Sequence, residues 1–156
     1  MNITYLGHAG WFIETKDVSI LCDAWNSKNP AFYNTWYVYP FNDHLDWDRY
    51  LNADILYTSH LHQDHFDEKT LKLLRRDIKI IVPEFRESRL IDKYKEMGFS
   101  NFTMGEMVIG NTKINTYVSE TIDRMMEDSM LLVSDGNNTF LNINDAELLE
   151  DNQREI

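Results

Sequence analysis

The amino-acid sequence predicts a mixed α/β domain, and three observations along the chain lead to this prediction. The N-terminal part consists of short apolar runs divided by tight turns, as in a β-meander. The middle alternates apolar runs with segments of helical periodicity, and the last third returns to strand-like runs. With 156 residues, of which 43% are hydrophobic, the chain is large enough to bury a core as a single domain over residues 1–156.

The N-terminal part is expected to form three strands, over residues 2–6, 10–15 and 18–23. Glycines at positions 7 and 10 mark the first turn between them. The next segment, residues 24–50, is rich in aromatic residues and asparagine and shows no clear period. We expect a long structured loop there, and loops of this length in compact domains are commonly functional.

The remaining elements follow from apolar runs and their stop signals. Asp67 is placed to cap a helix over residues 68–76, and a second helix is expected over residues 86–98, where Gly98 supplies the stop. A hairpin turn is expected at the sequence DGNN near the end of the chain. Five strands are expected over residues 54–59, 78–83, 112–118, 129–134 and 138–144.

Charge and composition restrict the function. The formal net charge of −11 argues against a nucleic-acid groove or an anionic membrane as partner, because both need a basic surface. The single cysteine, Cys22, requires no oxidising compartment, and the N-terminus lacks the features of a secretory signal. No apolar run approaches the roughly 20 residues that span a bilayer. We therefore expect a cytoplasmic protein that binds a cation and a small-molecule substrate.

The sequence HLHQDH crowds three of the five histidines into six residues directly after the predicted strand 54–59. In an extended segment, residues two apart point the same way, so His60 and His62 can bind one metal. Asp64 and His65 follow where the strand ends and can hold a second metal about 3.5–4 Å away. One or two divalent metals are expected, zinc first, with manganese or iron as alternatives. The other interpretation, a solvated polar loop, fits this spacing poorly.

The motif resembles the His-x-His-x-Asp-His signature of the metallo-β-lactamase fold superfamily. The opening TYLGHAGWFIE…ILCDAW is similar to one branch, which includes ascorbate-phosphate lactonase-like proteins, N-acyl phosphatidylethanolamine phosphodiesterase and CMP-sialic acid hydroxylase-like proteins. The resemblance runs from Met1 to about Asp145. It implies an αββα sandwich with metals at one edge, and, because the family's members are longer, a chain that lacks the C-terminal part of the fold.

The resemblance also implies the ligand set. His60 and His62 would bind the first metal, Asp64 and His65 the second, and Asp145 would bridge the two. Asp64 is the residue expected to orient the nucleophile during catalysis. Without the resemblance, Asp145 would be read as a turn or helix-capping residue.

Two further positions are expected to support the ligands, and two family histidines are absent. His8 matches a turn histidine near the site, and Asp23 would orient a ligand histidine through its free ring nitrogen. No histidine follows His65 in the sequence, so Glu120 is proposed to replace the missing ligand of the first metal. The acidic residues of 123–128 are read as a solvated face.

Three functions remain open on the sequence alone. The first is a hydrolase in which metal-activated hydroxide attacks an ester, lactone or phosphodiester. The second is a metal-binding relative with an incomplete site that acts by assembly with another chain. The third, part of a larger Rieske oxygenase, is disfavoured because one cysteine cannot hold such a cluster. Strands 129–134 and 138–144 are expected to need a second copy or a partner chain to cover them.

Overall fold

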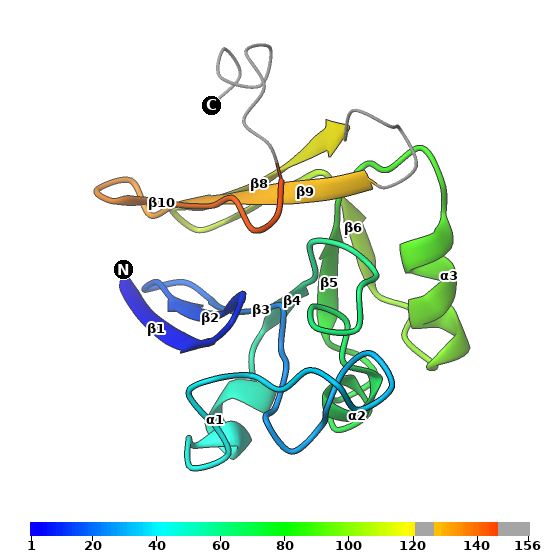
Figure 1. The fold of residues 1–156 in the computed structure, drawn as a ribbon. Helices are drawn as coiled ribbons and strands as arrows, with labels where there is room; N and C mark the ends of the chain where they lie inside the picture. Colours follow the sequence, from blue (N-terminus) through cyan, green and yellow to red (C-terminus); the bar gives the residue numbers. More distant parts are fainter. Residues whose placement is uncertain (121–126, 147–156) are drawn as a thin grey trace.

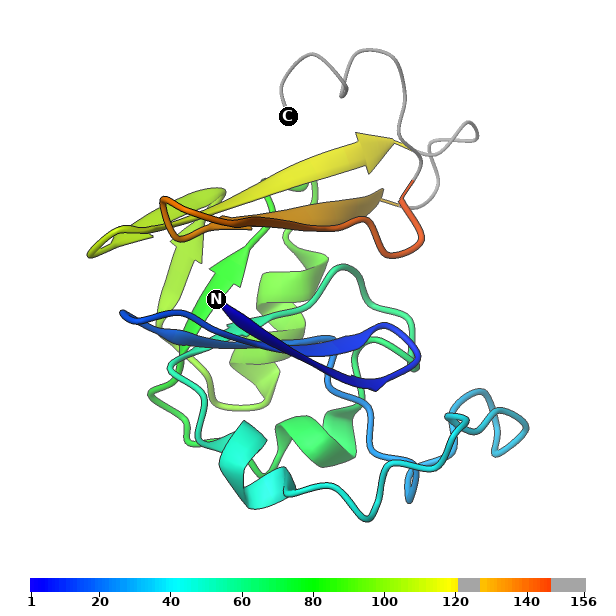
Figure 2. The ribbon, with the colours of Figure 1, turned by 90° about the vertical axis from the view of Figure 1, so that its left-hand side faces the viewer.

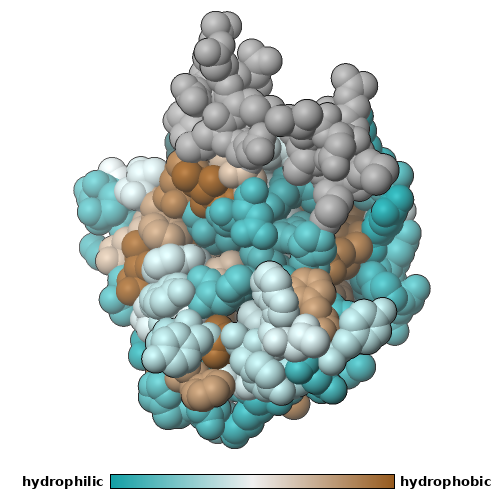
Figure 3. Space-filling view, in the orientation of Figure 1, coloured by the Kyte–Doolittle hydropathy of each residue, from teal (hydrophilic) through white to brown (hydrophobic). Residues whose placement is uncertain are grey.

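The computed structural model describes residues 1–120 and 127–146. It shows three layers: a four-stranded sheet, a six-stranded sheet, and helices on the far face of the six-stranded sheet (Figures 1 and 2). In the space-filling view, the coloured part of the face is mostly hydrophilic, with separate apolar patches (Figure 3). The two large clusters of buried apolar side chains lie between the layers.

The six-stranded sheet has the order β1-β2-β3-β4-β5-β6. The first three strands pair antiparallel, and β3 to β6 pair parallel. Parallel strands end at the same edge, so the chain leaves β3 and β4 side by side. The strands are β1 (Asn2–Gly7), β2 (Gly10–Glu14), β3 (Ser19–Cys22), β4 (Ile55–Tyr57), β5 (Lys79–Val82) and β6 (Phe102–Met104).

The second sheet is an antiparallel meander of order β10-β9-β8-β7. A single residue, Gly105, joins β6 to this sheet, and its φ of 66° is one that glycine adopts without strain. The strands are β7 (Glu106–Ile109), β8 (Thr112–Glu120), β9 (Glu127–Ser134) and β10 (Thr139–Asn142).

Three helices cover the outer face of the six-stranded sheet: α1 (Trp47–Leu51), α2 (Glu68–Leu71) and α3 (Arg89–Glu96). Asp46 and Asp67 cap the first two, each accepting a hydrogen bond from a backbone amide of the first turn. Amphipathic α3 buries Leu90 and Tyr94 against the sheet. The helical layer thus shields one side of the sheet that carries the HLHQDH segment.

Successive side chains of the strands point to opposite faces of the six-stranded sheet, which produces two separate hydrophobic cores. In β4, Leu56 faces the helices, whereas Ile55 and Tyr57 face the second sheet. Leu131 and Val133 of β9 fill the space between the sheets and are fully buried. The prediction that strand 129–134 remains uncovered is therefore wrong, because the six-stranded sheet itself covers it.

Substituting alanine for Leu131 is expected to lower the free energy of unfolding by about 2–5 kcal/mol, because it leaves a cavity between the sheets. Leu73 is 69% exposed, so its replacement by alanine is expected to change the value by less than about 0.5 kcal/mol. Urea denaturation followed by circular dichroism measures both. Equal effects of the two substitutions would contradict the assignment of Leu131 to the inter-sheet core.

Several predicted boundaries need correction. The predicted loop over residues 24–50 contains α1, and the predicted helix after Asp67 is only the four residues of α2. Strands β6 and β7 were not predicted at all. Among the described residues, no helix is long and apolar enough to cross a membrane.

Candidate metal centre

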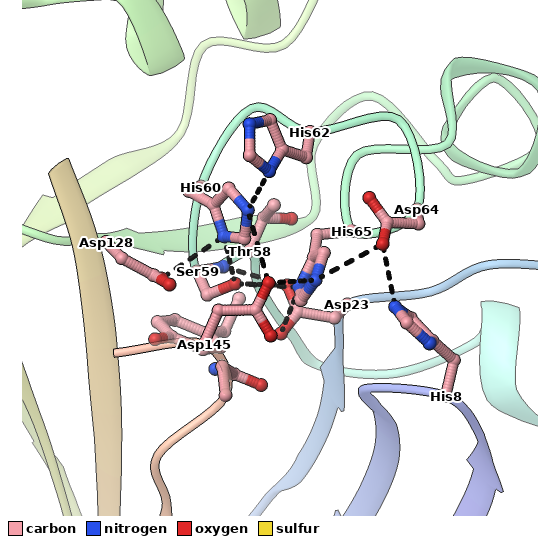
Figure 4. Close-up of polar contacts among 12 residues, drawn as sticks. His8, Asp23, Thr58, Ser59, His60, His62, Asp64, His65, Asp128 and Asp145 are labelled. Carbon is pink, nitrogen blue, oxygen red and sulfur yellow. Dashed lines mark hydrogen bonds and ion pairs between the residues drawn. The ribbon is translucent and has the colours of Figure 1, made fainter. Parts of the chain in front are cut away.

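The HLHQDH segment forms a compact turn directly after β4, at the edge where the two sheets meet (Figure 4). The backbone amides of His65 and Phe66 donate hydrogen bonds to the carbonyl of His62, at 3.0 and 2.7 Å. These bonds turn the chain back, so that His60 and His65 lie with ring centroids 4.2 Å apart. A local turn therefore converts a short motif into a cluster of side chains.

His60, His62 and Asp145 form a first group of metal-ligating atoms. The Nε2 atom of His60 lies 2.8 Å from Nδ1 of His62, and 4.0 Å from Oδ2 of Asp145. His60 is buried, whereas the Asp145 side chain is 60% exposed and comes from the loop after β10. The structure thus brings together three of the residues predicted to bind the first metal, His60, His62 and Asp145.

His8, Asp64 and His65 form a second group. Oδ2 of Asp64 lies 3.7 Å from Nε2 of His65 and 2.8 Å from Nε2 of His8. Oδ2 of Asp145 lies 3.4 Å from Nε2 of His65, as well as near His60. Asp145 therefore lies close to one histidine of each group.

Buried polar groups contact the Nδ1 atoms of two histidines, His60 and His65. Oγ of Ser59 lies 3.0 Å from Nδ1 of both His60 and His65. The carboxylate of Asp23, at the end of β3, accepts a hydrogen bond from the Ser59 amide and lies 3.6 Å from Nδ1 of His65. Contacts at Nδ1 leave the Nε2 atoms facing the centre of the cluster. Asp23 lies where its predicted supporting role requires.

Asp128, at the start of β9, is a residue that sequence reasoning missed. It is 5% exposed, and its Oδ1 atom lies 3.1 Å from Nδ1 of His60. The interpretation of Asp128 as part of a solvated face is therefore wrong. The available signal was its position, because it immediately precedes the apolar run of a buried strand. The neighbouring Ser129 donates a hydrogen bond from Oγ to the Ser59 carbonyl, which ties β9 to the histidine turn.

The electrostatics of the cluster favour a positive charge. Burial lowers the pKa of His65, but Asp23, Asp64 and Asp145 outweigh it and raise that pKa to about 9. Burial raises the pKa of Asp64, but His8 and His65 lower it further, so the net shift is downward. Burial lowers the pKa of the His62 ring, which favours the neutral form that can bind a metal.

The residues fit a metal ion by their unsatisfied atoms and their spacing. Among the described residues, Nε2 of His65 and Oδ1 of Asp64 are buried without a hydrogen-bond partner, which is costly unless something else binds them. Ligands about 2.1 Å from a tetrahedral metal lie about 3.4 Å from one another. The distances within the two groups, 2.8 to 4.0 Å, lie on both sides of this value. The cluster is therefore sized for divalent metals.

Replacing Asp128 with alanine is expected to weaken metal binding at the His60 group about 10–100-fold, because the ring loses the carboxylate that fixes its tautomer. Titration with zinc against a competing chelator measures this affinity. Asp43 is exposed in the loop before α1, and its replacement by alanine is the matched control. Equal affinities of the two variants would show that Asp128 does not act on His60.

The proposed replacement ligand Glu120 is not placed by the structure. Its backbone ends β8 opposite Glu127, but its side chain lies outside the described residues. Asp123 falls wholly outside them. His44 is exposed in the loop before α1, and Cys22 is buried in the inter-sheet core.

Comparisons with known proteins identify relatives that are longer than this chain. A protein from Mycobacterium tuberculosis, named for a Rieske 2Fe-2S iron-sulfur cluster, is 36% identical over 156 residues, which covers 94% of this chain and 30% of that protein. Cytidine monophosphate-N-acetylneuraminic acid hydroxylase from Asterias rubens is 40% identical over 86 residues, 53% of this chain and 13% of that protein. The chain thus spans less than a third of these relatives.

Solved structures share the fold. A protein from Veillonella parvula, described as a possible metal-dependent hydrolase, matches with a TM-score of 0.77 at 16% identity, over 97% of this chain and 65% of that one. CmlA, a diiron beta-hydroxylase from Streptomyces venezuelae, matches with a TM-score of 0.64 at 21% identity, over 92% of this chain and 29% of that one. The model of the beta-lactamase superfamily domain matches residues 2–148. The chain therefore belongs to the beta-lactamase superfamily domain family, and its α/β structure is the metallo-β-lactamase fold that the sequence predicts.

Proposed function

We propose that this chain is the metal-binding domain of a hydrolase that acts on an ester, lactone or phosphodiester. The observation that carries the proposal is the pair of ligand groups joined by Asp145, whose Oδ2 atom lies 3.4 Å from His65 and 4.0 Å from His60. This arrangement suits two divalent metals, with His60 and His62 on the first and Asp64 and His65 on the second. Zinc is the first candidate, and iron and manganese are the alternatives.

The side chains divide the work. Bound divalent metals would supply Lewis acidity and lower the pKa of water, which is the chemistry that hydrolysis at neutral pH needs. Asp64 holds one oxygen, Oδ1, without a partner among the described residues, so it can accept a proton from a nucleophile and orient it. Asp23 and Asp128 hold the histidine rings so that their free nitrogens point inward.

The surroundings of His62 support a small organic substrate. The ring of Phe32 stands edge-on to that of His62 with centroids 6.3 Å apart, and the Phe32 amide donates to the side chain of Gln63. Exposed aromatic side chains continue along the same loop, at Tyr33, Trp36, Tyr37, Tyr39 and Phe41. Phe32 and its ring neighbour Trp36 would offer apolar contact for part of a substrate beside His62.

Metal analysis tests the proposal. The chain, purified without chelators and loaded in turn with zinc, manganese and iron, is expected to bind about two equivalents per mole by elemental analysis. The loaded protein is then assayed on 4-nitrophenyl esters, a phosphodiester and a lactone, with the chelated protein as the control. Fewer than one equivalent of each metal would overturn the proposal, and hydrolysis that persists after chelation would contradict a metal mechanism.

A second candidate is an iron-binding domain of a larger oxidative protein. It is favoured by the likeness to a diiron beta-hydroxylase and by relatives of which the chain spans only 13–30%. Any Rieske cluster would need ligands beyond this chain, because the chain holds one cysteine. Tight iron binding with no hydrolysis by any metal form would favour this candidate over the hydrolase.

A further inference from the structure

We infer that His8 is a direct ligand of the second metal rather than a residue that supports a ligand from behind. The inference rests on the proposed dinuclear centre and names the residue that completes its second half. The turn between β1 and β2 brings His8 to this position, beside Asp64.

The ring atom that a residue contacts distinguishes a metal ligand from a residue that only orients a ligand. The supporting residues of this site contact the far side of a ligand: Asp128 and Asp23 approach the Nδ1 atoms of His60 and His65, not the Nε2 atoms that face the cluster. His8 behaves differently. Its Nε2 atom lies 2.8 Å from Oδ2 of Asp64, the same oxygen that faces Nε2 of His65 at 3.7 Å.

The geometry of the three atoms fits one ion. His8, Asp64 and His65 each offer one ligand atom, and these three atoms lie within 4.8 Å of one another. Oδ2 of Asp64 lies 2.8 Å from Nε2 of His8 and 3.7 Å from Nε2 of His65. These distances lie on either side of the roughly 3.4 Å expected between ligands of a tetrahedral metal. Oδ2 of Asp145, from the first group, lies 3.4 Å from Nε2 of His65, the shared edge of the two groups.

The backbone of His8 is held in the conformation that aims its ring at the cluster. His8 has a backbone φ of 52°, a left-handed value that residues other than glycine seldom adopt. The Tyr5 hydroxyl donates a hydrogen bond to the His8 carbonyl at 3.0 Å. The ring stands edge-on to Trp25 and to His65, with centroids 5.2 and 5.3 Å away. Neighbours on two sides thus fix the ring toward Asp64.

The test uses two substitutions that suit a left-handed backbone. His8→Gly removes the ring at a position where glycine is favoured, so the turn is expected to fold. His8→Asn also tolerates this φ and can still donate a hydrogen bond to Asp64, but it removes the imidazole. A supporting role would survive the asparagine substitution, whereas a ligand role would not. His44→Gly, in an exposed loop, is the matched control.

Binding of cobalt(II) is followed by its visible absorption and by elemental analysis. We expect the parent and His44→Gly to bind two equivalents, and both His8 variants to lose the second, with an affinity loss above the roughly 100-fold that a supporting residue costs. Free imidazole is expected to restore the second equivalent to His8→Gly. Retention of the second equivalent by His8→Asn, or no rescue by imidazole, would overturn the inference. A parent that binds no metal would instead overturn the proposed function.

Discussion

Replacing His60 and His62 together with alanine is expected to abolish metal binding at the first group and to leave about one equivalent in the second. The reason is that these two rings provide both nitrogens of the first group, with ring atoms 2.8 Å apart, and only Asp145 would remain. A single exposed carboxylate holds a transition metal weakly. Elemental analysis after dialysis measures the stoichiometry, and hydrolysis, if present in the parent, should be lost as well.

Because His60 is buried, its removal also leaves a cavity, and circular dichroism must show that the double variant folds. The single variant His62→Ala serves as a second check, since His62 is only partly buried and its loss disturbs packing less. Undiminished metal stoichiometry in both variants would show that the HLHQDH segment does not form the first metal position.

Replacing Asp145 with alanine is expected to weaken both metals at once, more than about 100-fold each, because its Oδ2 atom lies near the Nε2 atoms of both His60 and His65. Its side chain is 60% exposed, so the free energy of unfolding of the metal-free protein should change by less than about 0.5 kcal/mol. This combination of a large effect on metal and a small effect on stability is distinctive.

Metal titration and urea denaturation of the metal-free protein measure the two quantities. Asp48→Ala, at an exposed position of α1, is the acidic control and is expected to change neither. Loss of one metal with the other unaffected would contradict the bridging position of Asp145. In that case Asp145 would belong to one group only.

The residue pattern predicted the local part of the site, the family resemblance added His8, Asp23 and Asp145, and Asp128 was missed. The spacing of two between His60 and His62 acts within one segment, so periodicity alone showed that both rings could face one point. Asp128 meets His60 only because β9 of the second sheet packs beside the histidine turn. No pattern in a single segment records such a contact, and an acidic stretch reads as solvated surface.

The elements show the same division. The apolar runs of β4 and β5 were visible because they are buried on both faces. The five-residue helix α1 lies in a stretch full of asparagine and aromatic residues, and it is too short for a helical period to show. Strands β6 and β7, which have three and four residues and are separated by Gly105, were also too short for a period to show. Short elements depend on tertiary contacts rather than on sequence pattern.

The expectation that strand 129–134 stays uncovered failed for a topological reason. A sandwich sheet must bury its inner face against a partner layer, and the expectation was that this chain does not supply that layer. The meander β7–β10 folds back over the face of the six-stranded sheet opposite the helices, so Leu131 and Val133 are buried within the chain. Strand 129–134 therefore needs no second copy of the chain to cover these residues.

The candidate metal centre also has a consequence for how the chain folds. Its residues come from the first turn of the chain, the middle and the loop after β10, so every group depends on contacts between distant parts of the sequence. Contacts of high sequence separation form late, because long loops must close before the contacts are gained. The metal ion would then bind near the end of folding. It would stabilise the folded structure and would not nucleate folding. A chelator should speed unfolding while leaving the rate of refolding almost unchanged.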